Sequence, residues 1–365
     1  MSLDICDKSV IELIHKTSYT AGIPVGGGRV RRTSSIFCKE GFKMTRVKQD
    51  DFQGHERISL ENDKINISIL PQIGGKMISL KSKKTGKEFL SLSGRKFTRP
   101  VYGMGYGEFD ISGFDECFPA IAEGFYPEWP WKGTIIPDHG ELFTLPWECK
   151  IVKDKLFMAV YGVRFPYKLC KVVSLRENIV YIDYELENLS PYDFKYIWSA
   201  HPLFSVSQGT TILLPGTPSI RTDYSKHERF GKFLYETSWP TAKQADGRII
   251  DLSRVRSAKE DAATKVFSTK LKDGWCGLRY PDGVILKMVF PVRHVPYVGI
   301  WINEGGWPFT GKRSFNVAME PCTGCPDKLE TAIQRNECSV INGNSKNSWY
   351  LQIAIEEAKQ KKEFR

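Results

Sequence analysis

The stretch FNVAMEPCTG, residues 315–324, decides the fold class and holds the first candidate for chemistry. Large apolar residues occupy every second position from Phe315 to Met319, and small or polar residues stand between them, ending at Glu320. A period of two predicts a strand with one buried face. Pro321 and a Cys-Thr-Gly turn follow, so we expect Glu320 to lie where the strand stops. A carboxylate there either faces a ligand or is a solvated surface group, and the pattern leaves both interpretations open.

Alternation with this period recurs after residue 44, and in that part of the chain only the short segment 327–335 shows helical periodicity. The strand at 195–201 should stop at Pro202. The sequence shows neither βαβ alternation nor a repeat of about 20–50 residues. The predicted strands besides 315–320 are 65–69, 76–80, 180–186, 195–201, 284–290 and 349–355. Many strands and few helices predict an all-β sandwich or barrel.

Periodicity also predicts the domain organisation. Residues 1–43 lack a strand pattern and are interpreted as an N-terminal extension, while residues 44–358 are predicted to form one β domain, followed by a basic tail at 359–365. Residues 90–140 are rich in Gly, Pro and aromatic side chains, which is typical of functional loops. The polar residues 216–263 are predicted to be long surface loops.

The amino-acid composition bears on the partners and the cellular compartment expected for the protein. Lys and Arg outnumber Asp and Glu by 52 to 42, a net charge of +10, which scattered solvated lysines explain as well as an anionic partner does. We therefore expect no nucleic-acid partner. No run of eighteen apolar residues occurs, and the start MSLDICDKSV lacks a basic and then apolar leader, so no membrane partner is expected. Nine scattered cysteines are typical of reduced thiols in a cytoplasmic protein.

Two histidines stand out as partners for Glu320. His139 lies in the constrained loop PDHGE, and His201 lies in YIWSAHPLF at the predicted end of a strand. A single histidine in such a place is usually a structural hydrogen-bonding group, but two histidines and a carboxylate can move protons near neutral pH. The same set could hold zinc or iron, yet HxxxH and HxH spacings are absent. The one CxxC, Cys322 to Cys325, has no second half nearby, so we predict no metal.

Five segments in order, followed by the closing strand at 349–355, resemble the aldose 1-epimerase, or galactose mutarotase-like, superfamily over about residues 50–356. The segments are PQIGGKMISL (71–80), GFDECFP (113–119), DHGELFTLPWE (138–148), WSAHPLF (198–204) and MEPCTG (319–324). The resemblance implies a large antiparallel β-supersandwich that binds a sugar across a concave sheet. It also implies an isomerase that interconverts α and β anomers without a cofactor.

The resemblance assigns roles to the three candidate residues. Glu320 matches the catalytic base, His201 the general acid, and His139 a substrate-binding histidine. In this chemistry the base takes the proton of the anomeric hydroxyl while the acid protonates the ring oxygen, and the ring opens. One departure is Ala200, because the better-known galactose mutarotases have Asn before the second histidine.

The segment GFDECFP is similar instead to the glycine-rich CFP segment of the hexose-6-phosphate mutarotase branch. Asp115 within it, and Arg95 and Arg99 before it, are candidate sugar or phosphate contacts, although both arginines are equally well interpreted as surface residues. The substrate is thus expected to be an aldohexose or a hexose phosphate, and the protein a monomer or a homodimer. The alternative function is a non-catalytic sugar-binding protein on the same fold. The His–His–Glu set favours the enzyme, since a binding protein needs no base and acid together.

Overall fold

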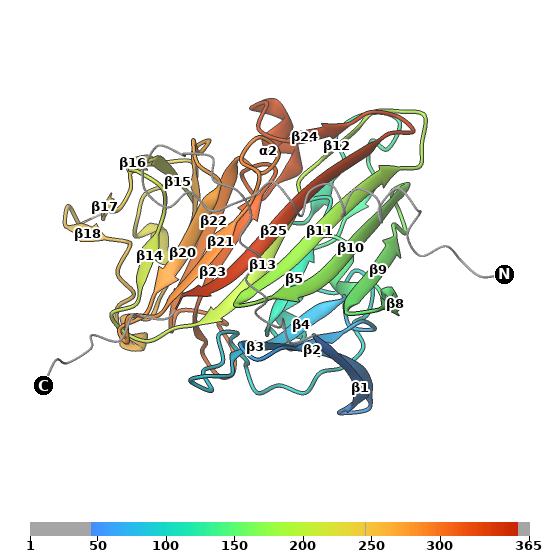
Figure 1. Cartoon of the computed structure of the whole chain (residues 1–365). Helices are drawn as coiled ribbons and strands as arrows, with labels where there is room; N and C mark the ends of the chain where they lie inside the picture. Colours follow the sequence, from blue (N-terminus) through green and yellow to red (C-terminus); the bar gives the residue numbers. More distant parts are fainter. Residues whose placement is uncertain (1–44, 245, 357–365) are drawn as a thin grey trace, which may run out of the picture.

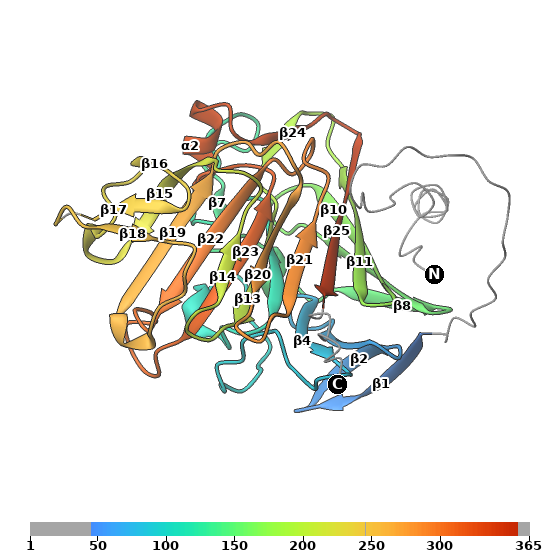
Figure 2. The ribbon, with the colours of Figure 1, turned by 60° about the vertical axis from the view of Figure 1, so that its left-hand side comes forward.

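A computed structural model describes residues 45–244 and 246–356, so the predicted extension (1–43) and basic tail (359–365) lie outside the described residues. Two large antiparallel sheets, of 11 and 8 strands, stack on each other (Figures 1 and 2). This arrangement confirms the predicted all-β sandwich. Within the described ranges, no helix is long and apolar enough to cross a membrane.

The larger sheet carries the candidate residues in its middle. In Figure 1 it lies behind the strands of the smaller sheet. Its strands, in spatial order, are β1 (Arg46–Phe52), β2 (His55–Glu61), β3 (Ile65–Leu70), β4 (Lys76–Ser82), β5 (Phe114–Cys117), β13 (Ser199–Ser205), β23 (Phe315–Cys322), β22 (Tyr297–Glu304), β19 (Ala262–Ser268), β15 (Ser219–Ser225) and β16 (Glu236–Ser238).

The smaller sheet covers one face of the larger one. Its strands, in spatial order, are β14 (Thr211–Leu213), β20 (Trp275–Arg279), β21 (Ile285–Val289), β25 (Lys346–Glu356), β11 (Ile179–Asn188), β10 (Tyr167–Arg176), β9 (Lys155–Tyr161) and β8 (Glu148–Val152). The remaining elements are short: the pairs β12 (Phe194–Tyr196) with β24 (Ser339–Ile341), β17 (Thr241–Lys243) with β18 (Ile249–Asp251) and β6 (Gly124–Phe125) with β7 (Ile135–Ile136), the helix α2 (Leu329–Gln334), and the 3₁₀ turns η1 (Tyr106–Glu108), η2 (Leu142–Thr144), η3 (Lys226–Glu228) and η4 (Ala258–Glu260).

The alternation in β23 decides which face of the larger sheet is buried. Val317 and Met319 are fully buried in the main core, where they belong to the same cluster as Leu351 of β25. Burying a side chain of this size contributes about 1.5–3 kcal/mol. Ala318, between them, and Glu320, after Met319, face the opposite side of the sheet, away from the smaller sheet. That side is the one available for a ligand.

Two predicted strand ends are wrong. Glu320 is followed by two further residues of β23, and β13 runs on through Pro202 to Ser205. A proline is tolerated inside β13 because the ladder between β13 and β23 is interrupted there: the strands pair at Ser199–Cys322 and again at Leu203–Ala318, but not in between. Pro321 stands in the same gap of the partner strand. The described structure therefore has prolines on both sides of the ladder where the candidate residues lie.

The prediction that residues 216–263 form surface loops is also wrong. This segment contains β15 to β18, and β15 pairs with β19 inside the larger sheet. Its polar strands sit near the sheet edge, where one face remains solvated, so the apolar alternation is weak. Within the predicted loop region 90–140, β5 is a four-residue strand in the centre of the larger sheet.

Candidate active site

One row of positions across neighbouring strands holds the candidate residues. His201 of β13 pairs with Asp115 of β5, and Glu320 of β23 pairs with Gly299 of β22. The two β13–β23 pairs that flank the ladder gap share one register, and this register puts His201 opposite Glu320. Opposed side chains in antiparallel strands have Cβ atoms about 4.5–5.5 Å apart. The structure thus brings His201 and Glu320 together on the open face of the sheet.

Glu320 is fully buried, so it is not a solvated surface group. Its Oε2 forms an ion pair with Nζ of Lys265 in β19. A Cβ at Gly299 would lie 3.2 Å from Oε2, so the glycine leaves room for the carboxylate. Oε1 has no hydrogen-bond partner among the described residues. An unpaired buried acceptor is costly, so this oxygen stands ready to accept a further hydrogen bond.

His201 is held from behind by a buried chain of charges. Its Nδ1 lies 3.1 Å from Oδ1 of Asp115, and Oδ2 of Asp115 lies 3.2 Å from Nζ of Lys76. Nζ of Lys76 also contacts both carboxylate oxygens of Asp110, at 2.7 and 2.8 Å. Burial alone would raise the pKa of Asp115, but the charges of Lys76 and His201 outweigh it, and the pKa is lowered. Both oxygens of Asp115 therefore face protein groups, and the ring of His201 has a fixed orientation.

His139 joins the set from the loop before Gly140. Its backbone has a φ of 58°, in the left-handed region, and its Nδ1 lies 2.8 Å from Oδ1 of Asp138. The ring stacks on Tyr106 at a centroid distance of 4.2 Å and lies 4.9 Å from the ring of His201. Oδ2 of Asp138 accepts a hydrogen bond of 2.8 Å from the backbone N–H of Tyr106, which ties two loops together. The three residues singled out from the sequence therefore meet in one place.

An acidic pair that sequence reasoning missed extends the site beyond Lys265. Nζ of Lys265 lies 3.6 Å from Oδ1 of Asp327, whose backbone N–H donates to Oδ1 of Asp223 at 3.2 Å. Burial raises the pKa of Asp223 well above its usual value, and the charge of Asp327 adds to the effect. Asp223 and Asp327 thus place two further carboxyl groups beside Lys265.

Aromatic rings lie beside this polar row. Trp301 of β22 pairs with Ala318 on one side and Lys265 on the other, and it is partly exposed. Its ring lies 6.1 Å from that of Trp307 and 6.0 Å from that of Tyr224. Flat apolar surfaces with a few convergent polar groups are typical of small-molecule sites.

The two candidate arginines are occupied by other contacts. Nη1 of Arg95 donates to the carbonyl oxygens of Gly107 and Phe109, at 2.7 and 2.8 Å, and so stabilises the loop that carries η1. Nη2 of the exposed Arg99 donates to Oε1 of Gln72 at 3.0 Å. No hydrogen bond within the described ranges joins either arginine to the His–His–Glu set. Their role as phosphate contacts stays a prediction.

Cys117 is a third group near the histidines that the sequence did not single out. Its Sγ and one ring nitrogen each of His139 and His201 lie within 4.8 Å of one another. Sulfur and imidazole are the ligands that zinc prefers, but the thiol must lose its proton first. Burial raises the pKa of Cys117 well above its usual value, so the thiol form is favoured. The expectation of no metal stays a prediction.

The contact between His139 and Asp138 predicts a pH dependence of stability. Burial alone would lower the pKa of His139, but the hydrogen bond and charge of Asp138 outweigh it and raise the pKa. The pair therefore stabilises the fold fully below the unfolded pKa of about 6.5, and its contribution is lost as pH rises through the folded pKa. Asp138→Asn should lower the free energy of unfolding more at pH 6 than at pH 9, as urea titrations would measure. Equal losses at both pH values would contradict this prediction.

Comparisons with known proteins agree with this fold. The structure superposes on a galactose mutarotase-like protein from Clostridium acetobutylicum with a TM-score of 0.61 at 14% identity, covering 86% of this chain and 99% of the other. A galactose mutarotase related enzyme from Lactobacillus acidophilus gives 0.58 at 15% identity, with 83% and 98% covered. A galactose mutarotase-like protein from Lactobacillus casei gives 0.55 at 16% identity, with 82% and 100% covered.

The sequence profile of a domain of unknown function, DUF5107, matches residues 34–122. No curated protein matches the chain. The structural matches confirm the galactose mutarotase-like fold, the part of the resemblance that likeness at 14–16% identity can establish. None of these findings distinguishes the hexose-6-phosphate branch.

Proposed function

We propose that the protein is an aldose 1-epimerase, an isomerase that interconverts the α and β anomers of an aldose. The observation that carries this proposal is the geometry of Glu320. One oxygen of its buried carboxylate is paired with Lys265, and the other, beside His201, has no partner among the residues that the structure describes. A base and an acid a few ångströms apart are what anomerisation needs, because one proton leaves O1 while another reaches the ring oxygen.

In the proposed reaction, Oε1 of Glu320 accepts the proton of the anomeric hydroxyl. His201, as imidazolium, donates from Nε2 to the ring oxygen, and the C1–O5 bond breaks to give the open-chain aldehyde. The aldehyde rotates about its bond to C2, and closure on the other face returns both protons. Asp115 fixes the orientation of the His201 ring, as a carboxylate behind a catalytic imidazole does.

Neighbouring groups would hold the sugar during this rotation. His139 and Asp223 supply hydrogen bonds to hydroxyl groups, and Trp301 supplies a flat apolar face. Lys76 and Lys265, the lysines of this site, are both already paired with carboxylates. Since no free cation stands beside the set within the described ranges, we infer a neutral aldohexose in preference to a hexose phosphate.

Polarimetry tests the proposal. Freshly dissolved α-D-galactose, α-D-glucose and glucose 6-phosphate would each be followed with and without the protein. We expect the optical rotation of a neutral sugar to reach the same final value faster with protein, since a catalyst leaves the equilibrium unchanged. If calorimetry detects sugar binding and the rotation is not accelerated, the protein is a non-catalytic sugar-binding protein on this fold.

A further inference from the structure

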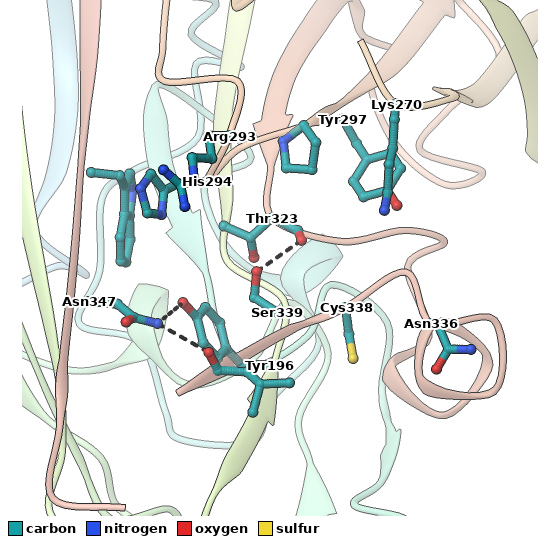
Figure 3. A pocket seen from close by; sticks show the side chains of 13 residues that line it. Tyr196, Lys270, Arg293, His294, Tyr297, Thr323, Asn336, Cys338, Ser339 and Asn347 are labelled. Atoms are coloured by element: carbon teal, nitrogen blue, oxygen red, sulfur yellow. Dashed lines mark hydrogen bonds between the residues drawn. The ribbon is translucent and has the colours of Figure 1, made fainter. Parts of the chain in front are cut away.

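A second site lies away from the candidate active site. A cavity of about 340 Å³ opens near the pair β12 and β24, beyond the end of β23 (Figure 3). Its lining includes Thr323, three residues after Glu320 in sequence, but none of the residues of the His–His–Glu set. The volume is within the range of about 300–1,000 Å³ typical of sites for small molecules.

The charged side chains that line this cavity are all positive. The cations Lys270 and Arg293 line it together with the imidazole of His294, and none of its thirteen lining residues is Asp or Glu. The side chains of these three residues form no ion pair or hydrogen bond with any other residue in the part of the chain that the structure describes. This distinguishes them from Lys76 and Lys265, which are both neutralised by carboxylates. Unneutralised cations around a concave surface raise the local concentration of anions.

Two buried donors without partners among the described residues belong to side chains that line the same cavity. Tyr297 is 1% exposed and Trp349 is 5% exposed, and both line the cavity. The hydroxyl of Tyr297 and the Nε1–H of Trp349 have no hydrogen-bond partner among the described residues. Leaving a buried polar group unpaired costs about 1–3 kcal/mol, so native proteins rarely do it without a ligand or water to complete the bond.

Hydrogen-bond donors and positively charged side chains line the cavity on two sides. Figure 3 shows Lys270 and Tyr297 together on one side, Arg293 and His294 on the other, and Thr323 between them. We propose that this cavity binds a phosphate monoester of a small metabolite. Phosphate oxygens accept several charge-assisted hydrogen bonds at once, which matches a lining of cations and neutral donors. The volume leaves room for the organic part of the ligand.

Tyr297→Phe gives the sharpest test. Because the hydroxyl has no partner within the described protein, its removal costs no intramolecular hydrogen bond, and the thermal stability without ligand should stay the same or rise. Calorimetric titration of the full chain with inorganic phosphate and with glucose 6-phosphate should show binding that weakens about tenfold in Tyr297→Phe. Arg293→Glu should abolish binding of both probes.

Controls separate this cavity from general charge and from the candidate active site. Arg46→Glu, on the exposed start of β1, changes the net charge equally and should leave binding unaltered. The double variant Glu320→Gln/His201→Asn should also bind both probes as the wild type does. The proposal is overturned if neither probe binds saturably, if Arg46→Glu weakens binding as much as Arg293→Glu, or if the active-site variant abolishes binding. None of these outcomes depends on whether the protein is an epimerase.

Discussion

Glu320→Gln is expected to reduce the rate of anomer interconversion by about 10²–10⁴, the usual contribution of a positioned general base. The amide keeps the shape of the carboxylate and can still accept a hydrogen bond, but it cannot take the anomeric proton at neutral pH. Binding of the sugar should therefore change much less than turnover. The rate would be measured by polarimetry on the sugar that the wild type accelerates most, and binding by calorimetry.

A matched control for this variant is Glu330→Gln, an exposed residue of α2. It removes the same charge from the same part of the chain and should leave the rate unchanged. Glu320→Gln also leaves Lys265 without its anionic partner, so folding must be checked by circular dichroism and thermal unfolding. A correctly folded Glu320→Gln protein with wild-type turnover would remove Glu320 from the mechanism.

His201→Asn should reduce turnover to a similar extent, because ring opening needs a proton delivered to the ring oxygen. Combined with Glu320→Gln, it should cost far less than the product of the two single losses, since both groups act on the same event. His55→Asn, at the start of β2, is the control: three strands separate β2 from β13 in the sheet. If the two losses multiplied, the residues would act in separate steps and the paired mechanism would be wrong.

Periodicity predicted the strands whose two faces differ most. In β3, β11 and β23 apolar and polar residues alternate, and a strand was found at each of these positions, although β23 runs two residues past its predicted end. β5 has only four residues, all buried, in a segment rich in Gly and Pro, so no alternation marks it. The end of β13 was misjudged because a gap in a ladder depends on the partner strand, which is more than a hundred residues away in sequence.

The candidate site, like the strands, could be predicted from the sequence only in part. Types of residue and local spacing singled out His139, His201 and Glu320, and the resemblance to a known family gave them roles. Lys265 was missed although it is the one charge in the run AATKVFS, because a lone lysine in a strand is usually a surface group. Asp327 was interpreted as the start of a helix. Both became visible only through their contacts in the folded chain.

Lys265 occupies one oxygen of the Glu320 carboxylate and leaves the other to accept the proton of the sugar. This has a stereochemical consequence. Both anomers must present O1 to the same free oxygen, although O1 is axial in one and equatorial in the other. The part of the sugar that turns is then C1 with its oxygen, while the hydroxyls from C2 onward stay in place. Selectivity among sugars should therefore depend on the configuration at C2, C3 and C4, and the two anomers of one sugar should bind with similar affinity.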